Sequence, residues 1–258
     1  MQPDQRLLSV VRRAVNLLLR VEKNLELRSA KRRAQSSIDT DGTIGKLTLL
    51  TLLPKDAVIL EIGACEGHDT QEFAVLFPRG RVIAFEAHPQ LHQRLVERTR
   101  GLPNVDCVGL AMSDHAGVQV FHQSSGASRV SGSLLRPSEH LQRHPAVVFS
   151  SADEVLIPCA TLDQYVGQMA PERVDLIWMD VQGAELMALK GAERTLSLTT
   201  WIYLEVSRAP LYEGAAPYSE IKQFLSSLGF EVEREFLPPE WHGEGNVLFA
   251  RSLKSSLG

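Results

Sequence analysis

The stretch AVILEIGACEGHDT, residues 57–70, decides the fold. Its first six residues form an apolar run that is typical of a strand buried on both faces. Glycines follow at once, and then an aspartate and a threonine of the kind that begin helices. A buried strand that passes through a glycine-rich turn into a helix predicts an open parallel sheet covered by helices.

The same alternation recurs along the chain. Short apolar runs rich in β-branched residues are separated by helical patterns, which predicts a doubly wound α/β fold with a mostly parallel sheet. The predicted strands are 57–62, 81–86, 105–111, 174–180 and 200–206. The predicted helices lie near 69–77, 89–100, 183–196 and 217–228.

Two departures from this rhythm carry information. The runs VQVFHQ (118–123) and EVLIPCA (154–160) bracket a stretch rich in serine, glycine and histidine, which predicts an inserted hairpin or flap at about 113–160. At the end, runs at 230–236 and 246–252 are joined by LPPEWHGEG, which is too short for a crossover helix. The last strand is therefore predicted to run antiparallel.

Composition narrows the class of protein. The chain has 258 residues, 44% hydrophobic and 22% charged, with a formal net charge of -4. Residues 1–40 carry nine lysines or arginines against four acids, whereas the remainder carries 18 against 27. An acidic body argues against nucleic acid as the partner. Three scattered cysteines and the absence of a long apolar run indicate a soluble protein of the cytoplasm.

The basic head is predicted to be a separate element. Leu7, Val11, Ala14 and Leu18 open a helical apolar repeat, so residues 5–33 are expected to form an amphipathic helix. The domain organisation expected is therefore a helix and linker at 1–45 before the main domain at 46–258. The apolar face needs a cover, which is either the body of the protein, a second copy of the chain, or a peripheral contact with a membrane surface.

The turn after the first strand points to a nucleoside. Gly63, Ala64 and Gly67 follow the acid Glu61, and such a turn lets a ligand approach bare backbone amides at a helix N-terminus. The spacing differs from the pattern that cradles a dinucleotide pyrophosphate. Glu86 ends the second strand nineteen residues beyond Gly67, near the offset at which an acid meets ribose hydroxyls. A nucleoside without phosphates, such as S-adenosylmethionine, fits both features.

At this point the chain resembles the FkbM-type S-adenosylmethionine-dependent methyltransferases. The resemblance covers residues 57–252 and rests on ordered motifs, namely LEIGACEGHDT, IAFEAHP, GLAMSDHAG, ATLDQY, VDLIWMDVQGAELMALKGA, IYLEVSRAPLYEGA and GNVLFA. It implies the class I methyltransferase fold, with seven strands and an antiparallel last strand. It also implies methyl transfer, commonly to a hydroxyl oxygen of a sugar or natural product.

Candidate catalytic residues lie at strand ends. Asp180 closes the fourth parallel strand, where a carboxylate can orient or deprotonate an acceptor hydroxyl. Gly183 keeps the next turn tight, and Glu185 then serves either catalysis or the start of the following helix. Glu205 ends the fifth strand on the same rim, as a second acid beside Asp180. The two could bind a divalent cation, but two oxygen donors fall short of the six that Mg²⁺ or Ca²⁺ takes, so a metal is not favoured.

The general base is left open among several histidines. His242, which follows Trp241 in the last loop, joins Asp180, Glu185 and Glu205 in the expected catalytic set. The other candidates are His122, His140 and His144.

The resemblance also suggests an adenine contact at Asp114 with Met112 packed near the ring, although aspartate also favours turns for its own reasons. Asp163 is expected to begin a helix capped by Thr161. The expected cofactor-binding residues are Glu61, Gly63, Ala64, Gly67, Glu86, Ala87, Met112, Ser113, Asp114 and Asp180. Two other activities share parts of this pattern, a nicotinamide-dependent oxidoreductase and a non-catalytic nucleoside-binding or assembly protein.

Overall fold

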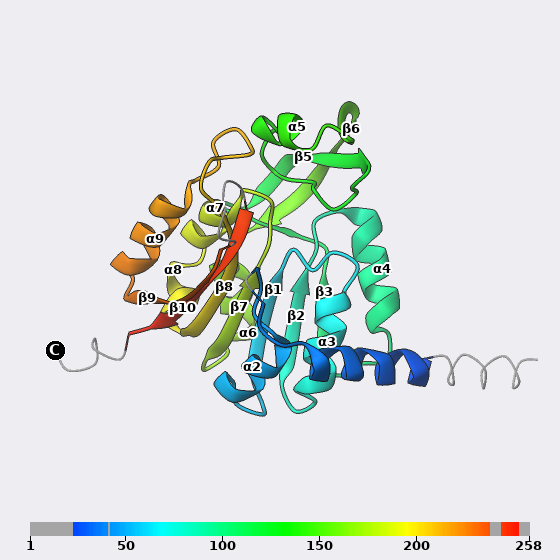
Figure 1. Ribbon diagram of the computed structural model, residues 1–258, viewed down its shortest axis with the longest axis vertical. Helices are drawn as coiled ribbons and strands as arrows, with labels where there is room; N and C mark the ends of the chain where they lie inside the picture. The colour runs from blue at the N-terminus through cyan, green and yellow to red at the C-terminus, as the bar shows by residue number, and fades with distance from the viewer. Residues whose placement is uncertain (1–22, 41, 238–243, 253–258) are drawn as a thin grey trace, which may run out of the picture.

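The computed structural model describes residues 23–40, 42–237 and 244–252. Its main feature is a seven-stranded sheet in the order β3-β2-β1-β7-β8-β10-β9 (Figure 1). The strands of this sheet are β1 Val58–Ile62, β2 Arg81–Phe85, β3 Val105–Val108, β7 Val174–Met179, β8 Thr199–Ser207, β9 Phe230–Phe236 and β10 Glu244–Arg251.

All neighbouring strands from β3 to β8 pair in parallel, and β10 pairs antiparallel with both β8 and β9. The predicted parallel sheet and the predicted antiparallel last strand are thereby confirmed. The chain order reverses at β1, which has β2 on one side and β7 on the other. In such sheets the ligand crevice lies beyond the carboxyl ends of the strands at that reversal.

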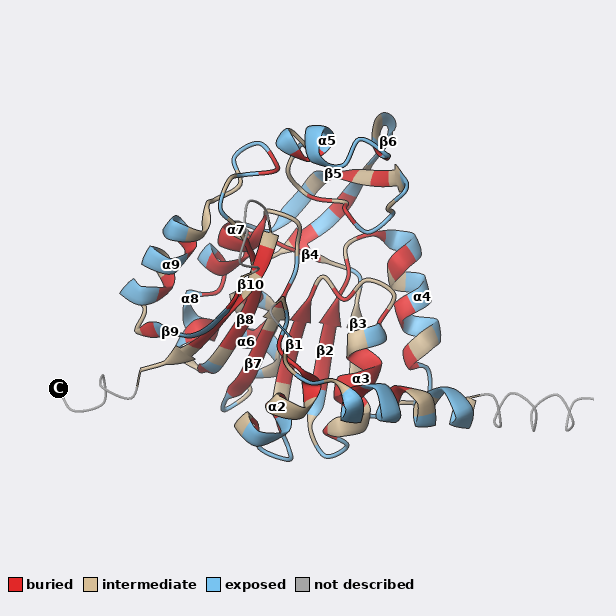
Figure 2. Cartoon of the chain, viewed as in Figure 1, coloured by how far each residue is buried: buried red, intermediate tan, exposed pale blue. Residues whose placement is uncertain are grey.

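Apolar side chains of the strands face helices on both sides, which explains the near-continuous hydrophobic runs. On one face Ile59 and Leu176 pack with α2 and α3, whereas on the other Leu60 and Ile177 pack with α6, α7, α8 and α9. Figure 2 shows the central strands β1, β2 and β7 as mostly buried. The helices are α2 Lys46–Leu52, α3 His68–Leu76, α4 Pro89–Thr99, α5 Glu139–Arg143, α6 Leu162–Met169, α7 Glu185–Lys190, α8 Glu193–Ser197 and α9 Tyr218–Ser227.

A second sheet lies over the carboxyl ends of the main strands (Figure 1). It has the order β4-β6-β5, with strands β4 Ala111–Met112, β5 Gly117–Gly126 and β6 Val147–Ala160. Strands β5 and β6 run antiparallel, and β4 runs parallel to β6. We call the loop between β5 and α5, residues 127–138, the flap loop.

Two sequence predictions of element bounds are wrong. The strand expected at 105–111 ends at Val108, and Ala111 and Met112 join the second sheet instead. The helix expected at 183–196 is two short helices, interrupted at Gly191. A β-carbon on Gly191 would stand 2.1 Å from the backbone oxygen of Ser113, so the chain passes too close to the second sheet for a regular helix to continue there.

Residues 23–36 form a helix that lies against the body, whereas residues 5–22 of the predicted helix lie outside the described residues. Arg33 pairs with Glu72 of α3 at 3.1 Å, and the Lys23 ammonium donates to the backbone oxygen of Arg98. Ala30 and Ala34 are buried. Among the described helices, none is both long and apolar enough to cross a bilayer.

Candidate active site

The turn after β1 is hydrogen-bonded to the neighbouring strand β2. The backbone N–H groups of Gly63 and Ala64 donate to the Phe85 oxygen at 3.0 and 2.9 Å. Gly63 has φ +88°, a left-handed conformation in which a side chain is strained. A β-carbon there would also stand 1.8 Å from the Asp180 backbone oxygen, so only glycine fits between the ends of β1 and β7.

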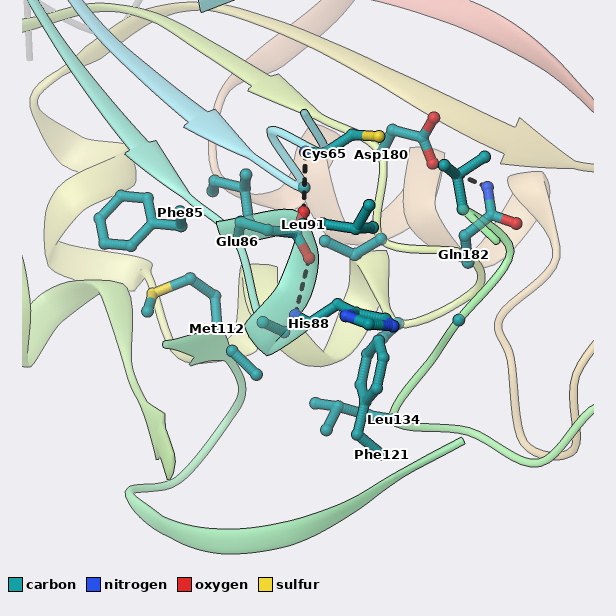
Figure 3. A pocket seen from close by; sticks show the side chains of 18 of the residues that line it. Cys65, Phe85, Glu86, His88, Leu91, Met112, Phe121, Leu134, Asp180 and Gln182 are labelled. Atoms are coloured by element: carbon teal, nitrogen blue, oxygen red, sulfur yellow. Dashed lines mark hydrogen bonds between the residues drawn. The ribbon is translucent and has the colours of Figure 1, made fainter. Parts of the chain in front are cut away.

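Glu86 joins the turns that follow β1 and β2. Its carboxylate accepts hydrogen bonds from the backbone N–H groups of Cys65 and His88, each at 2.7 Å (Figure 3). Burial removes water from this carboxylate and raises the pKa of Glu86 to about 7. Each oxygen retains acceptor capacity toward the cavity, which is what two ribose hydroxyls need.

A cavity of about 310 Å³ opens beside these turns, within the size range of small-molecule sites. One end is apolar, with Phe85 and Met112, and the other holds Asp180 and Gln182 (Figure 3). The second sheet and the flap loop cover it with Phe121, Val130, Ser131, Gly132 and Leu134. The apolar end, the buried Glu86 carboxylate and the polar far end match the base, the sugar hydroxyls and the charged part of the nucleoside expected from the sequence.

Asp180 lies at this far end because it directly follows Met179, the last residue of β7. Its backbone N–H donates to Ile62 of β1 at 2.9 Å, which fixes the residue beside the glycine turn. The side chain lines the cavity and is exposed there, and desolvation by the protein around it raises the pKa of Asp180. Its oxygen accepts a hydrogen bond from the Gln182 amide at 2.9 Å.

Glu205 of β8 stands next to Asp180. The same Gln182 amide donates to it at 3.1 Å, so one nitrogen bridges the two carboxylates. Burial raises the pKa of Glu205 to about 10, and the charges of Asp180, Glu244 and Glu185 add to this effect. At neutral pH the pair therefore retains a proton, because two carboxylates this close resist ionising together.

Glu185 has a structural task. One of its carboxylate oxygens accepts the N–H groups of Val181 and Gly183 at 3.2 and 3.1 Å, which closes the turn between β7 and α7. Burial raises the pKa of Glu185 to about 7. Of the two roles expected from the sequence, these contacts favour the structural one.

Oxygen atoms of Asp180, Glu185 and Glu205 lie within 4.8 Å of one another, a spacing that would suit a cation. The donor set fits one poorly, however. The Gln182 nitrogen donates to two of the carboxylates, and one oxygen of Glu185 is already taken by two backbone N–H groups. Whether the site takes a metal stays a prediction, and these contacts leave few free oxygen ligands for one.

Of the expected cofactor residues, half line the cavity, namely Gly63, Glu86, Ala87, Met112 and Asp180. The other five expected residues do not line the cavity. Glu61 is buried below the turn, where desolvation raises its pKa to about 8 and one of its oxygens lacks a hydrogen-bond partner. Asp114 is exposed and bonds to His115 and Ser113 outside the cavity. The remaining three are Ala64, Gly67 and Ser113.

The expected histidines do not gather at the described cavity. His122 pairs with Glu154 at 3.0 Å, and His140 packs on His144, Phe149 and Tyr212. His242 and Trp241 lie outside the described residues. Elsewhere, the helix start at Asp163 is confirmed, with Thr161 accepting from the Gln164 N–H in a capping box.

Two features of the site were not predicted from the sequence. His88 lines the cavity and, with Glu86, shapes the turn after β2. Gln182 supplies the bridge between the acids. Gln182 stands in the motif DVQGAE between two acids and has φ +55°, but sequence gives no sign of a partner 23 residues away.

Comparison with known proteins agrees with this geometry. A model of the FkbM methyltransferase domain matches residues 61–232. The 2-O-methyltransferase NoeI of Sinorhizobium fredii is 36% identical over 194 residues, covering 73% of this chain and 78% of that protein. The AMB antimetabolite synthetase AmbE of Pseudomonas aeruginosa is 29% identical over 207 residues, covering 70% of this chain and 10% of that protein. Methyltransferase 1 of Beauveria bassiana is 27% identical over 198 residues, covering 73% and 77%.

Proposed function

The chain belongs to the FkbM methyltransferase family and is an S-adenosylmethionine-dependent methyltransferase, and we propose that its acceptor is a hydroxyl oxygen of a sugar or related natural product. The family assignment favours methyl transfer over the two other activities that share parts of the sequence pattern. The sheet order, with β10 between β8 and β9, is that of the class I methyltransferase fold.

The observation that carries the acceptor proposal is the bridged acid pair at the end of the cavity. A hydroxyl is a poor nucleophile until its proton is accepted, and we assign this role to Asp180, which lines the cavity. The similarity to a protein named as a 2-O-methyltransferase points the same way. Sugar hydroxyls also suit a rim of carboxylates, because each carboxylate oxygen accepts hydrogen bonds.

In the proposed reaction S-adenosylmethionine supplies the methyl group of its sulfonium and leaves as S-adenosylhomocysteine. The chain's own contribution is largely positioning. Glu86 would hold the ribose hydroxyls, and the apolar end near Met112 and Phe85 would receive the adenine. Asp180 would accept the acceptor's hydroxyl proton as the new oxygen–carbon bond forms and the sulfur–carbon bond breaks.

The test is an acceptor screen. The protein is incubated with S-adenosylmethionine and a panel of mono- and oligosaccharides, with amine and carboxylate compounds as matched alternatives. The expected result is a product heavier by one methylene on a hydroxyl-bearing sugar, with equal release of S-adenosylhomocysteine. Methylation confined to nitrogen or carboxylate acceptors would overturn the proposal.

Location and partners are also proposals. The separated cysteines and the acidic body support a cytoplasmic enzyme with a small or glycan acceptor and no nucleic acid partner. The contacts of residues 23–36 with α3 and Arg98 support packing on the body for that part of the head. Self-association or a membrane contact would then involve other residues of the head.

A further inference from the structure

Gln182 occupies the centre of the acid cluster. Its side-chain nitrogen lies 2.9 Å from Asp180 Oδ1 and 3.1 Å from Glu205 Oε2, so a single amide group donates to both carboxylates. The residue holds a left-handed backbone conformation, φ +55°, in the turn between β7 and α7. Such strain in a residue other than glycine persists only where surrounding contacts enforce it.

Contacts from two other segments fix the orientation of this amide. Tyr212 donates its hydroxyl to Gln182 Oε1 at 3.0 Å, and the same hydroxyl lies 2.9 Å from the Ser131 oxygen. Burial raises the pKa of Tyr212, so the hydroxyl keeps its proton and acts as a donor. The single Tyr212 proton is shared between Gln182 Oε1 and the Ser131 oxygen, and the nitrogen faces the acids because ionised carboxylate oxygens can only accept hydrogen bonds.

The flap loop is tied to the same residue. Ser133 donates its hydroxyl to the backbone oxygen of Gln182 at 2.8 Å. Ser131 and Gly132 of this loop line the cofactor cavity. Gln182 thus connects the cover of the cavity to the acids at its far end.

We propose that Gln182 is a positioning residue that holds Asp180 and Glu205 together for proton acceptance, in the place where a divalent cation would otherwise be needed. This proposal rests on the proposed function for its catalytic consequence. The two carboxylates need a hydrogen-bond donor because other acids surround them. Negative charge around the pair comes from Glu185 of α7, Glu244 of β10 and Asp69 of α3. The basic groups described near Glu244 are Arg143 and His144, at the end of α5.

The first experiment needs no acceptor. Protein labelled with ¹³C at Asp and Glu carboxyl carbons is titrated by NMR as wild type, as Gln182→Asn and as Gln182→Glu. Asparagine tolerates a left-handed backbone but is too short to bridge both acids. Gln168→Asn, at an exposed position of α6, is the matched control.

The expected result is that the Asp180 and Glu205 signals titrate at higher pH in both Gln182 variants, by about one unit, because the donor that favours their charged form is gone. Tyr212→Phe should shift them in the same direction by less, since the amide stays but can rotate. Unchanged titration in Gln182→Asn and Gln182→Glu would overturn the proposal.

The second experiment measures turnover with a sugar acceptor identified in the screen above. Gln182→Asn should lower kcat about 100-fold, the scale of a misplaced catalytic group. Its Kd for S-adenosylmethionine, measured by calorimetry, should stay within about threefold of wild type because Glu86 and the glycine turn are intact. If wild type methylates no hydroxyl acceptor, the proposed function fails while the titration still decides the bridge. If wild type turns over and Gln182→Asn matches it, the positioning role fails alone.

Discussion

The backbone oxygen of Asp180 lies 1.8 Å from the point at which a β-carbon on Gly63 would stand. The turn that is to hold the cofactor and the strand end that carries the proposed base are therefore in direct contact. Gly63→Ala must push them apart and also strain a left-handed backbone. We expect a loss of at least about 2 kcal/mol in unfolding free energy, and no detectable S-adenosylmethionine binding by calorimetry. Gly101→Ala is the matched control, because Gly101 has φ +84° but open space around it. Equal stability loss in the two variants would show that the contact with Asp180 is unimportant.

Glu86→Gln should weaken S-adenosylmethionine binding. The substitution keeps the size of the side chain but removes the charge that accepts the Cys65 and His88 N–H groups and, in our proposal, the ribose hydroxyls. Hydrogen bonds to charged groups contribute about 1.5–3 kcal/mol, so Kd should rise by roughly one to two orders of magnitude. Calorimetry provides the measurement, with Glu97→Gln on the exposed face of α4 as the control. An unchanged Kd would remove Glu86 from the cofactor site.

Asp180→Ala should abolish most turnover and leave cofactor binding in place. Loss of a general base costs about 100-fold or more in rate. The rate is followed as S-adenosylhomocysteine release, and binding is followed by calorimetry on the same protein. Asp153→Ala, at an exposed position of β6, should behave as wild type. Normal turnover in Asp180→Ala would refute the assignment.

The ligand-free protein should become less stable as pH rises from 7 to 8.5. Burial raises the folded-state pKa of Glu61 to about 8 and of Glu205 to about 10, whereas both groups ionise near pH 4.5 in the unfolded chain. Between these values the folded state binds more protons, so raising the pH favours unfolding. We expect Tm to fall by about 6 °C over this interval. Glu205→Gln should reduce the slope and Glu97→Gln should leave it unchanged. A Tm that is constant or rises with pH in wild type would contradict the raised pKa values.

Chelation should not affect the reaction. The Gln182 nitrogen already lies between Asp180 and Glu205, and the pair retains a proton, so a hard cation finds few free oxygen ligands. Initial rates with EDTA should stay within about twofold of those without it, whereas a cation site built from hard oxygen donors would lose its ion. Loss of activity with EDTA, restored by Mg²⁺ or Mn²⁺, would show that the amide yields its place to a metal.

Sequence predicted the layers of this molecule well, because strands such as 57–62 and 81–86 are buried on both faces and their apolar runs are unmistakable. It failed where two distant segments meet. The predicted helix at 183–196 is interrupted because Gly191 passes against Ser113, and the strand predicted at 105–111 divides between two sheets. Both differences depend on contacts between distant residues, which the spacing of apolar residues along the sequence does not reveal.

The residues of the candidate site likewise fall into those that the sequence could predict and those that it could not. Gly63, Glu86 and Asp180 could be found from the ends of strands, because the position of a crevice in a parallel sheet follows from topology. The role of Gln182 could not, because it comes from hydrogen bonds to Tyr212 and to Ser133 of the flap loop, both far away in the chain. Glu185 was ambiguous in sequence since one carboxylate can serve a turn or a substrate equally well.

The place of β10 has a consequence for biosynthesis. Strand β9 leaves the ribosome before β10, yet among the described strands it pairs in the main sheet with β10 alone, which stands between it and β8. Until residues 244–251 have emerged, β9 has no edge on which to dock, and the helix α9 that precedes it has only part of its final platform. The outer edge of the sheet is thus completed only once β10 has been synthesised.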